Sequence, residues 1–193
     1  MSELQVLYSV ALGIALAAAV GLRVFLPLLA LSIAAYSGHV SLSDGFAWLG
    51  TMPALAMLAI ATIVEVAAYY IPGLDNALDA LATPVALLAG TVAAAAVMTD
   101  LPPLIKWTTA VIAGGGVAGL TQGASSLLRA KSTLTTGGLG NSVVASGELG
   151  GALVLSVLAI VMPLVALALA VALLWLVFKL VRRLVRGARR GAN

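Results

Sequence analysis

The sequence predicts an all-α membrane protein, a polytopic helical bundle of about six membrane segments with broken or re-entrant helices. The chain of 193 residues is 62% hydrophobic and 9% charged, with a mean hydropathy of +1.15, whereas soluble domains carry about 25% charged residues. Its apolar stretches are continuous and lack the period-two alternation of an outer-membrane barrel. Charges and prolines interrupt several stretches, and irregular backbone at membrane depth must be buried in protein or line a cavity.

The first apolar stretch, residues 11–35, carries a single charge, Arg23, near its middle. A charge at that depth costs roughly 3 kcal/mol on insertion scales, so we expect Arg23 to face a partner, a cavity or a substrate. Pro27 follows four residues later. Because proline removes the hydrogen bond to the carbonyl of Arg23, the helix is predicted to bend or break here.

The second and third stretches contain the next candidate charges. Glu65 lies inside residues 46–71, where it points either into the bundle or towards the nearer interface. After a Pro-Gly turn, Asp75 is predicted to cap a helix, with Asp79 one turn later, near its positive N-terminus. The third stretch, residues 84–98, is short for a crossing, so it either includes residues 76–82 or is re-entrant.

The fourth stretch, residues 107–128, is rich in glycine. Gly115, Gly119 and Gly123 form two consecutive GxxxG steps, which allow close approach of another helix, in a second copy or within the protomer. From this face and the small size of the bundle we expect a homo-oligomer. Gln122 lies beside it and can hydrogen-bond across helices.

The fifth and sixth stretches follow a polar segment. Residues 141–151, from Asn141 past Glu148, mix small residues, hydroxyls and one carboxylate, which predicts a discontinuous element. Residues 152–181 are interrupted by Pro163 and would measure ~45 Å as one helix, longer than the ~30 Å core of a bilayer.

We treat residues 1–193 as a single transmembrane domain, with half-repeats at 1–100 and 101–181 and a basic tail at 182–193. A polar group follows Gly-Leu in both halves, at Arg23 and at Thr121-Gln122. Two such halves are consistent with the inverted repeats that are common in transporters.

Six of the ten lysines and arginines lie in the last fifteen residues. The positive-inside rule then predicts a multi-pass protein of the inner (plasma) membrane with a cytoplasmic C-terminus, and the same cations can bind anionic lipid headgroups. With Arg129 and Lys131 also inside, six spans place both termini in the cytoplasm; five spans with the N-terminus outside are the alternative. No aromatic or motif context indicates nucleic-acid binding.

The chain has no cysteine and one histidine, so we predict no metal site and no cofactor. The glycine run at residues 114–116 lacks the lysine of a P-loop, and no other enzyme motif is present, so we expect no enzymatic activity. The candidate substrate- or ion-binding residues are Arg23, Glu65, Glu148, Asp75, Asp79, Gln122 and Asn141. Two interpretations stay open: a structural ion pair between Arg23 and a glutamate, or a site for a substrate, ion or proton.

Three segments, GLRVFLPLLAL, EVAAYYIPGLDNALDALATP and STLTTGGLGNSVVASGE, resemble the bacterial integral membrane family called domain of unknown function 4126, over most of the chain. That resemblance implies no activity. The Arg23–Pro27 segment is more weakly similar to the Arg-Phe-x-Pro element of DedA-type lipid transporters. We therefore predict a small transporter or channel-like protein with a polar site around Arg23, acting on an unknown small solute, within membrane lipids. The alternatives are a scramblase- or flippase-type lipid-handling protein and a non-transporting assembly factor.

Overall fold

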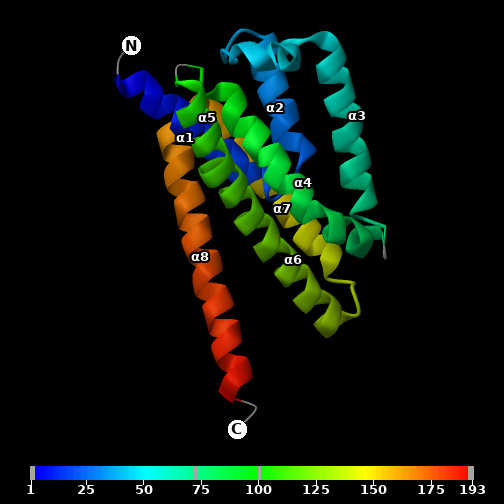
Figure 1. The fold of residues 1–193 in the computed structure, drawn as a ribbon. Helices are drawn as coiled ribbons and strands as arrows, with labels where there is room; N and C mark the ends of the chain where they lie inside the picture. Colours follow the sequence, from blue (N-terminus) through cyan, green and yellow to red (C-terminus); the bar gives the residue numbers. More distant parts are fainter. Residues whose placement is uncertain (1–2, 72–73, 100, 191–193) are drawn as a thin grey trace.

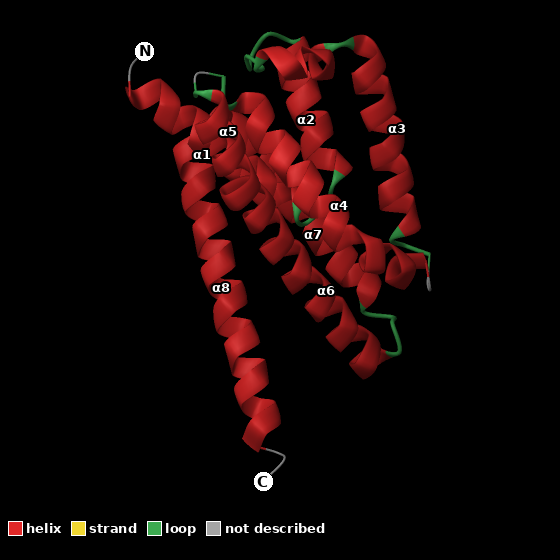
Figure 2. Ribbon diagram, in the orientation of Figure 1, coloured by secondary structure: helices red, strands yellow, loops and turns green. Residues whose placement is uncertain are grey.

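The computed structural model describes residues 3–71, 74–99 and 101–190, and within α4 and α8 the side chains of residues 74–77, 79, 80, 177, 180, 181 and 183–190 lie outside that description. All regular structure in these ranges is helical (Figures 1 and 2), which confirms the all-α prediction. The elements are α1 (Glu3–Val20), α2 (Phe25–Tyr36), the 3₁₀ helix η1 (Asp44–Gly50), α3 (Met52–Ala68), α4 (Leu74–Val97), α5 (Pro103–Thr109), the π-helix η2 (Ala110–Gly115), α6 (Gly116–Thr136), α7 (Asn141–Val161) and α8 (Pro163–Arg190).

Three helical stretches in the described ranges are long and apolar enough to cross a membrane: Glu3–Val20, Pro103–Thr136 and Asn141–Val161. A fourth is added if η1 and α3, which meet at 68°, count as one bent span. The other apolar helices are shorter, including Phe25–Tyr36 and Leu81–Val97. The membrane class is therefore supported, while the count of about six segments and the inverted repeat stay predictions.

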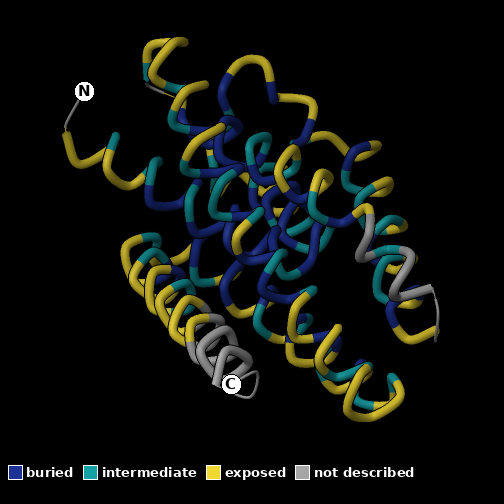
Figure 3. The backbone as a smooth tube through the Cα atoms, turned by 60° about the horizontal axis from the view of Figure 1, so that its bottom comes forward, coloured by how far each residue is buried: buried dark blue, intermediate teal, exposed yellow. Residues whose placement is uncertain are grey.

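Helix α1 forms the centre of the bundle and packs against α4, α6, α7 and α8. Its inner faces are alanines and glycine, so neighbouring backbones come close: a Cβ added at Gly13 would lie 3.1 Å from the Cα of Ala94 in α4. Small residues of this kind are typical of membrane helix interfaces, where close packing replaces the hydrophobic effect. Figure 3 shows the buried positions gathered in the middle and the exposed ones along the outer helices.

The predicted glycine face lies largely inside the protomer. A Cβ at Gly115 would be 3.0 Å from the carbonyl oxygen of Leu87 in α4, and one at Gly119 would be 2.6 Å from the Leu87 side chain. Gly123 has no such neighbour within 4 Å. The face therefore serves mainly to join α6 to α4. The homo-oligomer stays a prediction, and this face no longer supports it.

The helix boundaries correct one local prediction and decide between the two alternatives that were open for another. Residues 141–151 are the first half of α7, a regular helix, because its buried residues recur at helical spacing and pack on the bundle, whereas its serines face outwards: Asn141, Ala145, Glu148 and Ala152 are buried. The third stretch starts at Leu74, so α4 is a continuous helix of 24 residues with Pro84 inside it. Pro163 separates α7 from α8, in agreement with the predicted interruption.

Helix α3 stands at one edge of the molecule. It packs on α2 and η1, and Figure 1 shows it beside α2 and apart from α8. This position leaves a crevice between α3 and α4, which forms part of the site described below.

Candidate functional site: a buried charged cluster

The first membrane stretch breaks at the predicted place. Helix α1 ends at Val20 and α2 begins at Phe25, so residues 21–24 form a non-helical link. Gly21 packs directly against α6, because a Cβ added at this position would be 2.6 Å from the Cβ of Thr121. The link holds the Arg23 side chain inside the bundle, where it is 1% exposed.

Glu148 is the carboxylate that gathers the cluster. It is buried on α7, and its Oε2 atom lies 3.5 Å from Nη2 of Arg23. Arg129 of α6 donates from Nε to its Oε1 atom at 3.2 Å and from Nη2 to Oε2, and the hydroxyl of Ser125 also donates to Oε1. Arg23 further donates to the carbonyl oxygen of Ala145, one turn before Glu148, at 2.9 Å. Two buried guanidinium groups therefore share one carboxylate.

Tyr69, at the end of α3, adds an aromatic ring to the two cations. The guanidinium carbon of Arg23 lies 4.0 Å from the ring centroid, and that of Arg129 lies 4.1 Å from it. Cation–π contacts are worth about 2 kcal/mol or more when desolvated. Both arginines are therefore stabilised from α3 as well as from α7.

Glu65 joins the cluster through the backbone. Its Oε1 atom accepts the N–H of Val24 at 2.7 Å, and its Oε2 atom accepts the N–H of Phe25 at 3.0 Å. These amides open α2, and no side chain of the helix itself caps them. The carboxylate of α3 thus caps the start of a helix 40 residues earlier in the sequence, at an end where negative charge is favoured.

Three of the candidate residues, Arg23, Glu65 and Glu148, lie together in this cluster, although Glu65 binds the backbone beside Arg23 and not its guanidinium group. Two other candidates form hydrogen bonds with different partners. Gln122 donates to the hydroxyl of Ser126 at 3.2 Å, and Asn141 donates to the hydroxyl of Thr133 at 3.0 Å. Asn141 therefore joins α7 to α6. The side chains of the last two candidates are outside the described part of the chain: Asp75 and Asp79.

Sequence reasoning missed Arg129 and Tyr69. From the sequence, Arg129 counts only as a cation on the cytoplasmic side of the membrane, and Tyr69 is not a candidate. A signal for Arg129 was present, because four α6 residues at helical spacing form one buried polar face: Thr121, Gln122, Ser125 and Arg129. No comparable pattern marks Tyr69.

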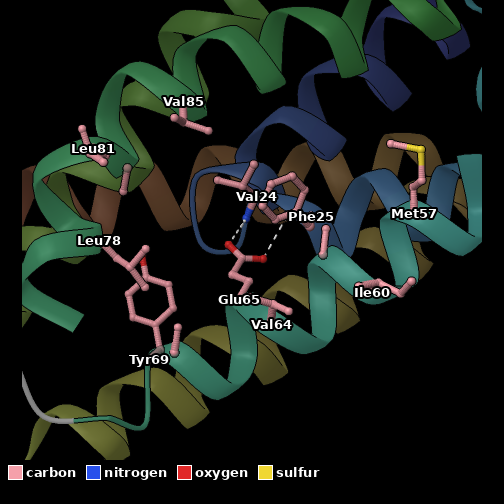
Figure 4. A pocket seen from close by; sticks show the side chains of 13 residues that line it. Val24, Phe25, Met57, Ile60, Val64, Glu65, Tyr69, Leu78, Leu81 and Val85 are labelled. Atoms are coloured by element: carbon pink, nitrogen blue, oxygen red, sulfur yellow. Dashed lines mark hydrogen bonds between the residues drawn. The ribbon is translucent and has the colours of Figure 1, made fainter. Parts of the chain in front are cut away.

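Two apolar crevices reach this cluster from different sides. The first has a volume of about 600 Å³, and its lining comes from the start of α2, from α3 and from α4. Glu65 and Tyr69 lie on its wall, with Leu81 and Val85 facing them from α4 (Figure 4). The second, of about 400 Å³, includes Glu148 and is otherwise lined by apolar side chains and glycines of α6–α8 and the α1–α2 link.

The cluster combines two guanidinium and two carboxylate groups in apolar surroundings. Guanidinium groups bind carboxylates and phosphates through paired hydrogen bonds, so the arginines are suited to an anionic group. Within the described residues no three histidine, aspartate or glutamate side chains gather to hold a metal ion.

The comparisons with known proteins give a family and no activity. The family model "Domain of unknown function (DUF4126)" matches residues 10–183, a range that contains Arg23, Glu65, Arg129 and Glu148. No curated protein and no solved structure matches the chain. Because the matched range covers most of the sequence, the chain belongs to the DUF4126 family of domains of unknown function.

Proposed function

We propose that this protein is a small membrane transporter of an amphiphilic anion and that the cluster around Arg23 is its binding site. The observation that carries this proposal is the apolar crevice between α3 and α4, which ends at Glu65 and Tyr69 on the edge of the charged cluster. An amphiphilic anion needs an apolar surface for its hydrocarbon part next to cationic groups for its charged part.

The crevice suits the apolar part of the substrate. Its walls are aliphatic apart from Phe25, Glu65 and Tyr69, and α3 packs on α2 and η1, so the α3–α4 side is the weakly joined one. A hydrophilic solute would have to leave water for an apolar wall, which is costly. A lipid-like molecule enters from the bilayer without that cost.

The arginines suit the anionic part. Glu148 now occupies both guanidinium groups, as a substrate carboxylate or phosphate would. Binding of an anion therefore requires Glu148 to move or to be neutralised, which makes Glu148 the residue that competes with substrate. Transport of a soluble solute, the leading expectation from sequence, finds less support in these walls.

The proposal includes the setting of the protein. The cations of the C-terminal helix favour a cytoplasmic C-terminus in a bacterial inner membrane. In Figure 1 the N- and C-terminal marks lie at opposite ends of the bundle, which favours a layout with the N-terminus outside. The proposal also includes assembly into a homo-oligomer, for which the small size of the bundle is the remaining reason.

Flux in proteoliposomes tests the function. The full chain is reconstituted, and transfer of a labelled anionic phospholipid is compared with uptake of a soluble fluorescent anion. We expect lipid transfer that Arg23→Gln abolishes, because Glu148 keeps Arg129 and the fold is retained. Lys106→Gln, at a cation far from the cluster, is the matched control. Uptake of the soluble anion alone would replace the proposed substrate class, and no flux of either would favour an assembly role.

A further inference from the structure

A third apolar groove lies between α6 and α8, away from the charged cluster. Its volume is about 650 Å³. The α6 wall is made of Gly119, Leu120, Gly123, Ala124 and Leu127, and the α8 wall of Val171, Leu174, Trp175 and Phe178. Every lining side chain is apolar apart from the indole N–H of Trp175. Such a surface on a membrane protein is matched by hydrocarbon.

One end of this groove is cationic on both walls. On α8, Lys179 follows Phe178 directly, and Arg182 continues the Trp175–Phe178 line at a spacing of four residues. On α6, Lys131 lies one turn beyond Leu127. All three cations are described and exposed.

The two helices run in the same direction towards the end of the molecule that carries the C-terminus, and they diverge as they approach it (Figure 1). The cations therefore lie at the wide end of the groove. Lys179 places its ammonium group 4.8 Å from the centroid of the Trp175 ring. Tryptophan and lysine side chains of this kind mark the depth of the membrane interface.

We propose that this groove is a binding site for an anionic phospholipid, with an acyl chain between α6 and α8 and the headgroup phosphate at Lys179 and Arg182 of α8, while Lys131 adds positive charge on the α6 side. The charge pattern selects a lipid over a helix of a second copy. The exposed carboxylates among the described side chains, Glu3 and Asp44, lie at the opposite end of the molecule (Figure 1). Clustered cations beside an apolar helix attract anionic lipids.

Fluorescence of Trp175 tests the site. In the full chain carrying Trp48→Phe and Trp107→Phe, Trp175 is the remaining tryptophan. Vesicles contain phosphatidylglycerol or phosphatidylcholine with brominated acyl chains, which quench a tryptophan in contact. We expect brominated phosphatidylglycerol to quench Trp175 at about tenfold lower mole fraction than brominated phosphatidylcholine, and Lys179→Gln with Arg182→Gln to remove that preference. A variant that keeps only Trp48, which is exposed on η1, should show no preference.

A pair of glycines supplies a matched control for the groove itself. Gly123 and Gly116 both have open space where a Cβ would be placed, but only Gly123 lines the groove. Gly123→Leu is therefore expected to reduce quenching of Trp175 by phosphatidylglycerol, whereas Gly116→Leu leaves it unchanged.

Three results would overturn the proposal. The first is equal quenching of Trp175 by the two lipids, and the second is a preference that survives removal of both α8 cations. The third is a tryptophan shielded from both lipids in a protein of doubled mass, which would assign the groove to a second copy. None of these depends on whether the chain transports anything, so this site and the proposed function are tested separately.

Discussion

Replacing Glu148 with glutamine removes the carboxylate charge that both buried arginines face. At 3.5 Å, the Arg23–Glu148 attraction is about 5 kcal/mol at an effective dielectric constant of about 20. Part of it only offsets the cost of burying the charges, and breaking a buried pair typically costs about 3–5 kcal/mol. We expect Glu148→Gln to lower the free energy of unfolding by that amount.

The contacts also predict an order among the variants. Arg129 makes two contacts with Glu148, while Arg23 makes one at the longer distance. Arg23→Gln leaves Glu148 paired with Arg129, so it should cost about 1.5–3 kcal/mol, in the range of a single hydrogen bond to a charged group. Arg129→Gln should fall between the two. Combining Arg129→Gln with Glu148→Gln should recover part of the loss, because it removes a cation together with its counter-charge.

Unfolding of the purified protein in mild detergent, followed by heat or denaturant, measures these differences. The reasoning is refuted if Arg23→Gln is as destabilising as Glu148→Gln, because the two arginines would then not share the carboxylate unequally. It is refuted as well if Glu148→Gln costs less than about 1 kcal/mol, the size of an ordinary surface pair.

Three further outcomes are expected. Gly21→Ala should cost about 1–3 kcal/mol, because the new Cβ meets the α6 backbone and overpacks it, whereas Gly123→Ala, in open space, should be neutral or slightly stabilising in the same unfolding assay. Glu65→Leu should leave the amides of Val24 and Phe25 without their acceptor, at a cost of about 1–3 kcal/mol of stability for each amide. The hydrogen exchange of these amides, measured by mass spectrometry, should become faster; unchanged exchange would contradict the cap. Cysteines placed at Glu3 and Lys179, in a chain with no native cysteine, should be labelled from opposite sides of the membrane; labelling of both from one side would restore the layout with six spans and both termini inside.

The sequence was informative where a residue type is costly in a membrane. A lone Arg23 followed by Pro27 predicted a broken helix with a buried cation, because neither is tolerated in a plain span. The same argument brought Glu148 to Arg23, since an isolated carboxylate in the same medium is equally costly. Composition and continuous apolar stretches also predicted the helical class.

The remainder of the site depends on tertiary structure that no local pattern contains. Arg129 is separated from Arg23 by more than a hundred residues, and only the path of α6 past the α1–α2 link brings them together. The acceptor role of Glu65 towards backbone amides has no sequence signature, because any chain segment can supply an N–H group. The regular helix at 141–151 was missed because serine and glycine disfavour helices, while the burial of Asn141, Ala145 and Glu148 at helical spacing against the bundle outweighs that preference.

The cap that Glu65 provides has a consequence for the co-translational insertion of the chain. A ribosome delivers residues 11–35 to the membrane before α3 exists, and at that moment the amides of Val24 and Phe25 have no carboxylate to receive them. In hydrocarbon those amides are satisfied most cheaply by continuing the helix through the link. We therefore expect the nascent chain to extend the first helix into the link, with only the bend that Pro27 imposes, until Glu65 is synthesised and inserted. A residue synthesised some forty positions later then completes the break in the first segment.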